Sequence, residues 1–192
     1  VTISGNTKFE GDSEIYGGFT SMYGDVTGNK VTISGNTTFE GDSEIYGGES
    51  RGGKAENNIV EISGNTKFEA NSDIYGGHSV YGEANKNSVI INDGTINSYV
   101  YGGYAHSNSG TANITANENS VIISGGTITG NVYGGYAYPS SGEANANNNQ
   151  VIISGGTINN SYVCGGASGY GEATNNKVTI SGNTTFKEAT SY

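Results

Sequence analysis

One pattern of apolar and polar positions recurs along the whole chain. Each repeat opens with V-x-I, in which Val and Ile flank a variable residue, as in Val31-Thr32-Ile33. This alternation places the two apolar side chains on one face of a β-strand. A turn containing Gly, Asn or Asp follows, because these residues tolerate positive φ. The repeats open at Val1, Val31, Val60, Val89, Val121, Val151 and Val178, and their spacings are 27 to 32 residues by subtraction.

Two further short strands are predicted in each repeat. The second strand is centred on one large apolar residue: Phe9, Phe39, Phe68, Ile96, Ile128, Ile158 and Phe186. The third is centred on Ile15, Ile45, Ile74, Val100, Val132 and Val163. By alternation, the residue after this third column faces outward. That position holds Tyr16, Tyr46, Tyr75, Tyr101, Tyr133 and Cys164. Two glycines then let the chain bend, and a variable polar loop with a weak extra strand completes the repeat.

The repeats occur in two forms. In the first three, 15 residues separate the opening Val from the outward Tyr, as in Val31 and Tyr46. In the next three, the step is 12, 12 and 13 residues. The long form carries an acidic turn, EGDSE or EANSD, and the short form carries GTI.

One repeat is too small to bury the apolar face of its strands alone. Successive repeats can bury this face by stacking on one another. We therefore predict an all-β fold in one domain, residues 1–192. It is a right-handed parallel β-helix (β-solenoid) of about 6.5 coils, with three short strands per coil and coils about 4.8 Å apart. A β-propeller is the main alternative, but its blades need four strands in about 40–50 residues. Helical repeats are disfavoured by the Gly, Thr and β-branched content.

Composition narrows the classes of function. The 192 residues include 33 Gly, 14 Tyr and a single Arg51, and the net charge is −10. This charge argues against binding to nucleic acid or to an anionic membrane surface. No apolar run approaches the ~18 residues of a membrane-spanning helix. Cys164 is the single cysteine, so an internal disulfide is excluded, and no His or Asp stands at a nucleophile-like spacing from it.

The repeat style points to a family. The segment Asn119–Gly135 reads NSVIISGGTITGNVYGG. It resembles the Gly/Asn-rich repeats of autotransporter-like surface proteins and adhesins of Gram-negative bacteria, and the likeness covers nearly the whole chain. The resemblance implies a right-handed β-helix displayed outside the cell, at the bacterial surface. It implies a structural role, as a stalk, adhesin or fibre segment, since a repeat style is no catalytic signature.

The outward column Tyr16, Tyr46, Tyr75, Tyr101 and Tyr133 has two interpretations. Rings about one coil apart are near enough to stack. The column could form a flat aromatic strip that binds sugar rings or a neighbouring rod. It could instead be an aromatic ladder that stabilises the solenoid. Cys164 interrupts the column, which favours packing over a binding strip.

Acidic residues also fall into rows. These are Glu10, Glu40 and Glu69; Asp12 and Asp42; and Glu14, Glu44 and Asp73. Like charges one coil apart repel by roughly 1 kcal/mol in water. Calcium held by Glu10, Asp12, Glu40 and Asp42 would relieve this repulsion. The spacing matches neither a nine-residue calcium repeat nor an EF-hand, so a solvated acidic edge without a cofactor is the favoured interpretation.

The histidines and the recurrent asparagines are not expected to form a functional site. His78 and His106 stand in variable segments at different offsets and show no metal-binding spacing, so we expect surface histidines. An asparagine precedes each V-x-I and is expected to form a stacked amide ladder: Asn29, Asn58, Asn87, Asn119, Asn149 and Asn176.

We do not expect an enzyme. Polysaccharide lyases and hydrolases built on β-helices need one irregular cluster of carboxylates with a basic residue. Here the acids recur with the repeat, so a polysaccharide-degrading enzyme is the least favoured alternative. An ice-binding array is disfavoured because the position after each opening Val is irregular. The main alternative is a carbohydrate-binding module that uses the tyrosine strip and the variable loops.

The two ends show no polar capping unit, which solenoids normally carry. We therefore expect either a section of a longer solenoid or subunits that stack end to end through unpaired strand edges. The expected partners are further copies of the chain and a glycan or host surface. Nucleic acid and membrane insertion are not expected.

Overall fold

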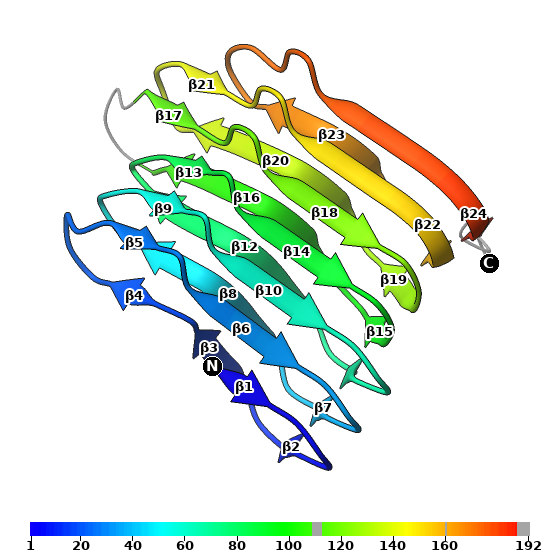
Figure 1. Ribbon diagram of the computed structural model, residues 1–192. Coiled ribbons are helices and arrows are strands. Elements are labelled where there is room, and N and C mark those ends of the chain that lie inside the picture. The colour runs from blue at the N-terminus through cyan, green and yellow to red at the C-terminus, as the bar shows by residue number, and fades with distance from the viewer. Residues whose placement is uncertain (109–112, 160, 188–192) are drawn as a thin grey trace.

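The chain folds as a β-solenoid of parallel strands. The computed structural model describes residues 1–108, 113–159 and 161–187 (Figure 1). In these residues every strand pairing is parallel and all regular secondary structure is β. Successive repeats lie side by side as coils of one stack, with Val31, Val60 and Val89 in register. The predicted all-β solenoid is therefore confirmed. The described residues contain no helix of the length and apolarity required to cross a membrane.

We call each successive strand position of a coil an arm. The first and second arms correspond to the first two predicted strands. The first arm comprises β1 (Thr2–Ile3), β6 (Lys30–Ile33), β10 (Ile59–Ile62), β14 (Ser88–Ile91), β18 (Ser120–Ile123), the start of β22 (Gln150–Asn159) and the start of β24 (Lys177–Lys187). The second comprises β2 (Lys8–Phe9), β7 (Thr38–Phe39), β11 (Lys67–Phe68), β15 (Thr95–Ile96), β19 (Thr127–Thr129) and the ends of β22 and β24.

The third arm is longer than predicted. It comprises β3 (Ser13–Tyr16), β4 (Phe19–Thr20), β8 (Ser43–Ser50), β12 (Ser72–Val80), β16 (Val100–Ser107), β20 (Val132–Pro139) and β23 (Val163–Ser168). The expectation that the paired glycines end this strand was wrong for β8, β12, β16, β20 and β23, which continue through them. The weak extra strand, which we call the fourth arm, is confirmed in five coils: β5 (Val26–Thr27), β9 (Ala55–Glu56), β13 (Ala84–Asn85), β17 (Ile114–Thr115) and β21 (Ala144–Asn145).

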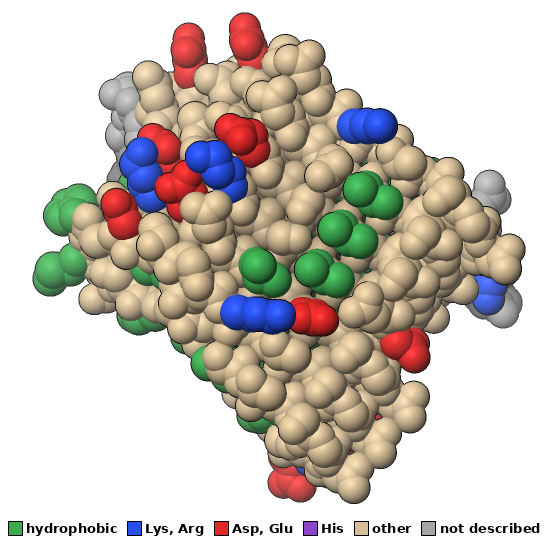
Figure 2. All heavy atoms as spheres, viewed as in Figure 1, with side chains coloured by type: hydrophobic (Ala, Val, Ile, Leu, Met, Phe, Trp, Pro, Cys, Tyr) green, Lys and Arg blue, Asp and Glu red, His purple; other side chains and the backbone are tan. Residues whose placement is uncertain are grey.

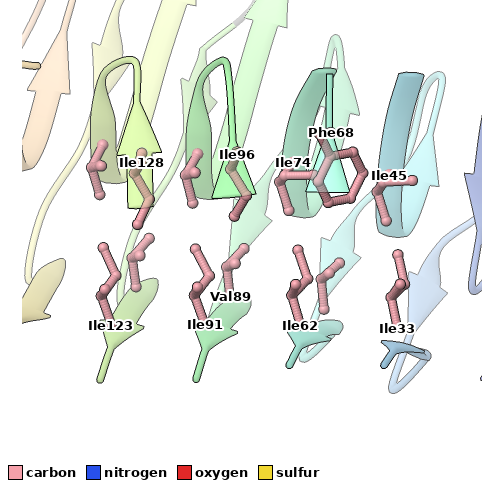
Figure 3. Close-up of a cluster of buried hydrophobic side chains, with 14 of the residues drawn as sticks. Ile33, Ile45, Ile62, Phe68, Ile74, Val89, Ile91, Ile96, Ile123 and Ile128 are labelled. Carbon is pink, nitrogen blue, oxygen red and sulfur yellow. The ribbon is translucent and has the colours of Figure 1, made fainter. Parts of the chain in front are cut away.

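The main core lies between the first three arms. Columns of identical or similar side chains run along the stack, such as Ile33, Ile62, Ile91 and Ile123 (Figure 3). The rings of Phe9, Phe39 and Phe68 stack with their centroids 4.5 Å apart. Burying such side chains contributes about 1.5–3 kcal/mol each. The predicted apolar columns are therefore the hydrophobic core.

A second, smaller core lies beside the fourth arm. Its fully buried members are Ala84, Ala105, Ile114, Ala116, Ala137, Ala144 and Ala146. Six of these seven members are alanines, and Ile114 is the large side chain among them. This core was not predicted, because its alanines fall in segments whose sequence indicated polar loops.

The predicted asparagine ladder is confirmed, and it separates the two cores. The side-chain amide of Asn58 donates to Oδ1 of Asn87 at 3.1 Å, and that of Asn87 donates to Oδ1 of Asn119 at 3.2 Å. Asn87 also donates to the backbone oxygen of Ala55 at 2.8 Å. These asparagines are almost completely buried. The ladder therefore satisfies backbone and side-chain groups where the chain turns inside the coil.

The outer face of the first arm combines polar side chains with several isoleucines. Figure 2 shows a short row of green apolar side chains on this face, bordered mostly by tan surface, with one blue and one red side chain at its end. Ile90, Ile122 and Ile152 are in register there and are half-buried. Opposite charges pair near the fourth arm, where Lys54 and Glu83 are 3.2 Å apart and Lys86 and Glu56 are 3.0 Å apart.

Candidate functional site: the aromatic face of the third arm

The tyrosine column lies on the outer face of the third arm. The rings of Tyr16, Tyr46, Tyr75 and Tyr101 stack face to face with centroids 4.9–5.1 Å apart. They lie outside the main core, as alternation predicted, and form a cluster of their own. The expectation that they are exposed was wrong for three of them: Tyr46, Tyr75 and Tyr101 are 4%, 6% and 8% exposed.

A second column covers the tyrosines. It is formed by the residue that follows the paired glycines: Phe19, Glu49, His78, Tyr104, Tyr136 and Ala167. The ring of Tyr104 lies 5.0 Å from Tyr101, and that of Tyr136 lies 5.1 Å from Tyr133. This column was not predicted, because the paired glycines indicated a bend of the chain. The recurrence of a large residue directly after the glycine pair was the available signal.

The ring geometry favours a packing role over a sugar-binding strip. Tyr16 and Tyr46 are tilted by only 4° to each other, and Tyr46 and Tyr75 by 7°. The flat faces of these rings therefore cover one another along the stack. A sugar ring packs on the flat face of an aromatic side chain, and within the column that face is already occupied by the next ring.

The tyrosine hydroxyls are tied to the acidic row beside them. Tyr16 donates to Glu14 at 2.6 Å, and Tyr75 donates to Asp73 at 3.1 Å. Burial, together with the neighbouring carboxylates, raises the pKa of Tyr46 and Tyr75 well above the ordinary value. Burial also raises the pKa of Tyr104 to about 12. The phenols are therefore neutral hydrogen-bond donors at physiological pH. The carboxylates of the acidic row act as their acceptors.

The other acidic residues have local partners too. Oδ1 of Asp12 accepts the backbone N–H of Asp42 at 3.0 Å, and Oδ1 of Asp42 accepts that of Asn71 at 3.1 Å. Lys8 Nζ lies 2.9 Å from Glu40 and 3.4 Å from Glu10. Hydrogen bonds from the next coil and a lysine thus offset the repulsion within these rows.

The acidic edge borders a groove of about 860 Å³, lined by polar and acidic residues from four successive coils, among them Asp12, Asp42 and Asp73. Within residues 1–108, 113–159 and 161–187, no three or more His, Cys, Asp or Glu side chains are grouped to hold a metal ion. The calcium candidates Glu10, Asp12, Glu40 and Asp42 instead make the contacts described above. These contacts suit the interpretation of the rows as a solvated acidic edge.

The two histidines meet, contrary to the sequence-based expectation. His78 lies in β12 and His106 in β16, and Nε2 of His78 is 3.0 Å from Nδ1 of His106. His78 is 7% exposed, so it is no surface histidine. The different offsets concealed the pair, because His78 is in register with Tyr104 and His106 is in register with Val80. Such diagonal neighbours on adjacent strands are within reach of each other when side chains are long or aromatic.

A buried carboxylate lies beside this pair. Glu49 is 3% exposed, and its Oε1 accepts a hydrogen bond from Nε of Arg51 at 3.2 Å and lies 3.9 Å from Nδ1 of His78. Burial raises the pKa of Glu49, although Arg51 opposes the shift. Burial, followed by the nearby His106 and Arg51, lowers the pKa of His78 to about 3. His78 is thus neutral in the folded chain at physiological pH.

Cys164 continues the tyrosine column in the sixth coil. It is in register with Tyr133 and is half-buried. The ring stack therefore ends at Tyr133 on this side of the solenoid.

The chain is a β-solenoid repeat protein by its fold. Comparison with known protein families, with curated proteins and with solved structures gives no match. Interpretation of the site therefore depends on its own geometry.

Proposed function

We propose that the chain is a non-catalytic structural segment of a bacterial surface protein, a β-solenoid stalk or adhesin arm that stands outside the cell. The observation that carries this proposal is the use of polar and aromatic side chains as ladders. The asparagines bind the next asparagine, and the tyrosines stack on the next tyrosine. Side chains engaged in this way maintain a regular rod. The cell-surface location is supported by the repeat style of Asn119–Gly135.

The same proposal includes contact between copies of the chain. The nine residues Val178–Phe186 are identical to Val31–Phe39. Val31–Phe39 packs against the coil of Val60–Phe68, and its core side chains are buried there. In contrast, Val178, Ile180 and Phe186 are 40–51% exposed, and β24 pairs with the short-form strand β22 through a register shift. A long-form coil such as Val1–Phe9 of a second copy would match β24 without that shift.

Surface labelling tests the location directly. An antibody raised against the purified chain should stain intact source cells, and external protease should remove the staining. Cells that stain only after permeabilisation would contradict the proposed extracellular role.

Glycan binding is the second candidate function. It is favoured by tyrosines that lie outside the buried column, such as Tyr138, Tyr162 and Tyr170, which are 47%, 73% and 60% exposed. Exposed aromatic faces and a polar surround suit sugar rings. On a glycan array, a binding module should give specific signals that Tyr138→Ala and Tyr170→Ala weaken without loss of fold. A pure spacer should give no signal.

A further inference from the structure

The histidine pair is a polar contact inside an otherwise aromatic surface. The chain contains two histidines, and both are in this contact although they are 28 residues apart. A hydrogen bond between Nε2 of His78 and Nδ1 of His106 requires one nitrogen to carry a proton and the other to offer a lone pair. Two imidazolium rings carry protons on all four nitrogens, so the doubly charged pair cannot make this bond.

Three aromatic rings surround His78 and remove it from water. Its centroid lies 5.5 Å from Tyr46, 5.2 Å from Tyr75 and 5.3 Å from Tyr104. Nδ1 of His78 has no hydrogen-bond partner among the described residues. Burial of an unpaired charge is costly, so this environment selects the neutral ring.

Charged and titratable groups face the pair from each neighbouring strand. The β8 segment contributes Glu49 and Tyr46, and Arg51 follows it directly. β12 contributes Tyr75, β16 contributes Tyr104, and Tyr138 of β20 is in register with His106. Arg51 disfavours a charge on His78. Glu49 favours one, but its Oε1 already accepts a hydrogen bond from Arg51.

Solvent protons have a route to the pair. A hollow of about 380 Å³ is bordered by Arg51, Tyr81, His106 and Asn108, among others. His106 is half-buried, and His78 lies deeper. A first proton on His106 is compatible with the contact, because Nδ1–H of His106 then donates to Nε2 of His78. A second proton, on His78, abolishes the acceptor and places two like charges against each other.

We propose that the His78–His106 pair is an acid-sensitive latch that holds the outer aromatic layer of β8, β12 and β16 closed at neutral pH and releases it on acidification. The main core and the asparagine ladder lie on the inner side of these strands and contain no histidine. Acidification therefore loosens the second column and the strand ends that carry it, and exposes the tyrosines beneath, while the first and second arms of the coils stay stacked.

Nuclear magnetic resonance of the ring nitrogens tests the latch, since two histidines give a simple spectrum. We expect His106 to titrate first and His78 to remain neutral until the pH is well below 5. Amide hydrogen exchange of His78, Val80 and Tyr104 should become at least tenfold faster, relative to Ile62 and Ile91, between pH 7.5 and the pH at which His78 becomes charged. Comparison with these core amides corrects for the intrinsic pH dependence of exchange.

Two variants separate the latch from general acid sensitivity. His78→Tyr and His106→Tyr place in each column the residue that the neighbouring coil already has, Tyr104 and Tyr138 respectively. The double variant should stay folded and lose the relative change in exchange. The latch is refuted if both histidines of the unaltered chain titrate near the free-imidazole value of about 6.5. It is also refuted if the double variant keeps the same relative change in exchange.

Discussion

The side-chain amide of Asn87 lies directly against Gly77, and a Cβ atom on that glycine would overlap it. The same relationship links Gly48 to Asn58 and Gly103 to Asn119. The second glycine of each pair is therefore required by the buried asparagine ladder, in addition to any turn it makes. The V-x-I column, the Y-G-G motif and the asparagine of each repeat are thus parts of one packing arrangement.

Gly77→Ala is expected to destabilise the fold. The new methyl group has no space, and the buried amide against it has no freedom to move, so the cost should be about 2–3 kcal/mol or more. Urea unfolding followed by circular dichroism measures this cost. Gly11→Ala is the matched control, because nothing lies within 4 Å of a Cβ at Gly11. Equal effects of the two substitutions would argue against the proposed contact.

Asn87→Ala is expected to cost about 3 kcal/mol in the free energy of unfolding. It removes the bonds to Ala55 and Asn119 and leaves the backbone N–H of Asn58 without its acceptor. Buried groups without partners cost about 1–3 kcal/mol each. Asn36→Ala removes exposed amide contacts to Asn6 and Asn65 and should cost less than about 1 kcal/mol. Similar losses in both variants would show that burial of the ladder contributes nothing.

Alkaline titration should divide the tyrosines into two groups. A phenol in free solution ionises near pH 10. Tyr46, Tyr75 and Tyr101 have a raised folded-state pKa, chiefly from burial. Their contribution to stability is present below pH 10 and is lost as the pH rises above it, because the unfolded chain ionises first. Absorbance at the phenolate band should therefore rise in two steps, and the second step should coincide with unfolding.

Tyr75→Phe tests the assignment of the second step, whose amplitude it should reduce. A single smooth transition of all the tyrosines near pH 10, with the fold intact, would contradict the buried column.

Removal of divalent cations should leave the chain unchanged. The acidic rows are held by backbone N–H groups and by Lys8, so EDTA should shift the unfolding temperature by no more than about 1 °C. A bound ion at 100 times its dissociation constant would stabilise the fold by about 2.7 kcal/mol. A drop of several degrees on chelation, reversed by calcium, would therefore restore the calcium interpretation of Glu10, Asp12, Glu40 and Asp42.

The fold could be predicted because each coil repeats the same pattern of apolar residues and turn residues. The alternation of Val31 and Ile33 and the recurrence of Phe39 and Phe68 specify both the strands and the stacking. The aromatic face was harder to predict, because the path of the chain after Gly47-Gly48 depends on contact with Asn58 in the adjacent part of the coil. The meeting of His78 with His106 depends on a diagonal between two columns, which the offset of each residue within its own repeat does not reveal.

The buried apolar columns and the asparagine ladder run through successive coils, so the stacked coils should unfold as one cooperative unit. Amide hydrogen exchange of the purified chain at pH 7.5, followed by mass spectrometry across a urea series, tests it most directly. We predict slow exchange at the inward columns from Ile33 to Ile153, with all these amides losing protection at a common urea concentration. Protection confined to a few neighbouring coils, with the rest exchanging freely at low urea, would contradict the claim.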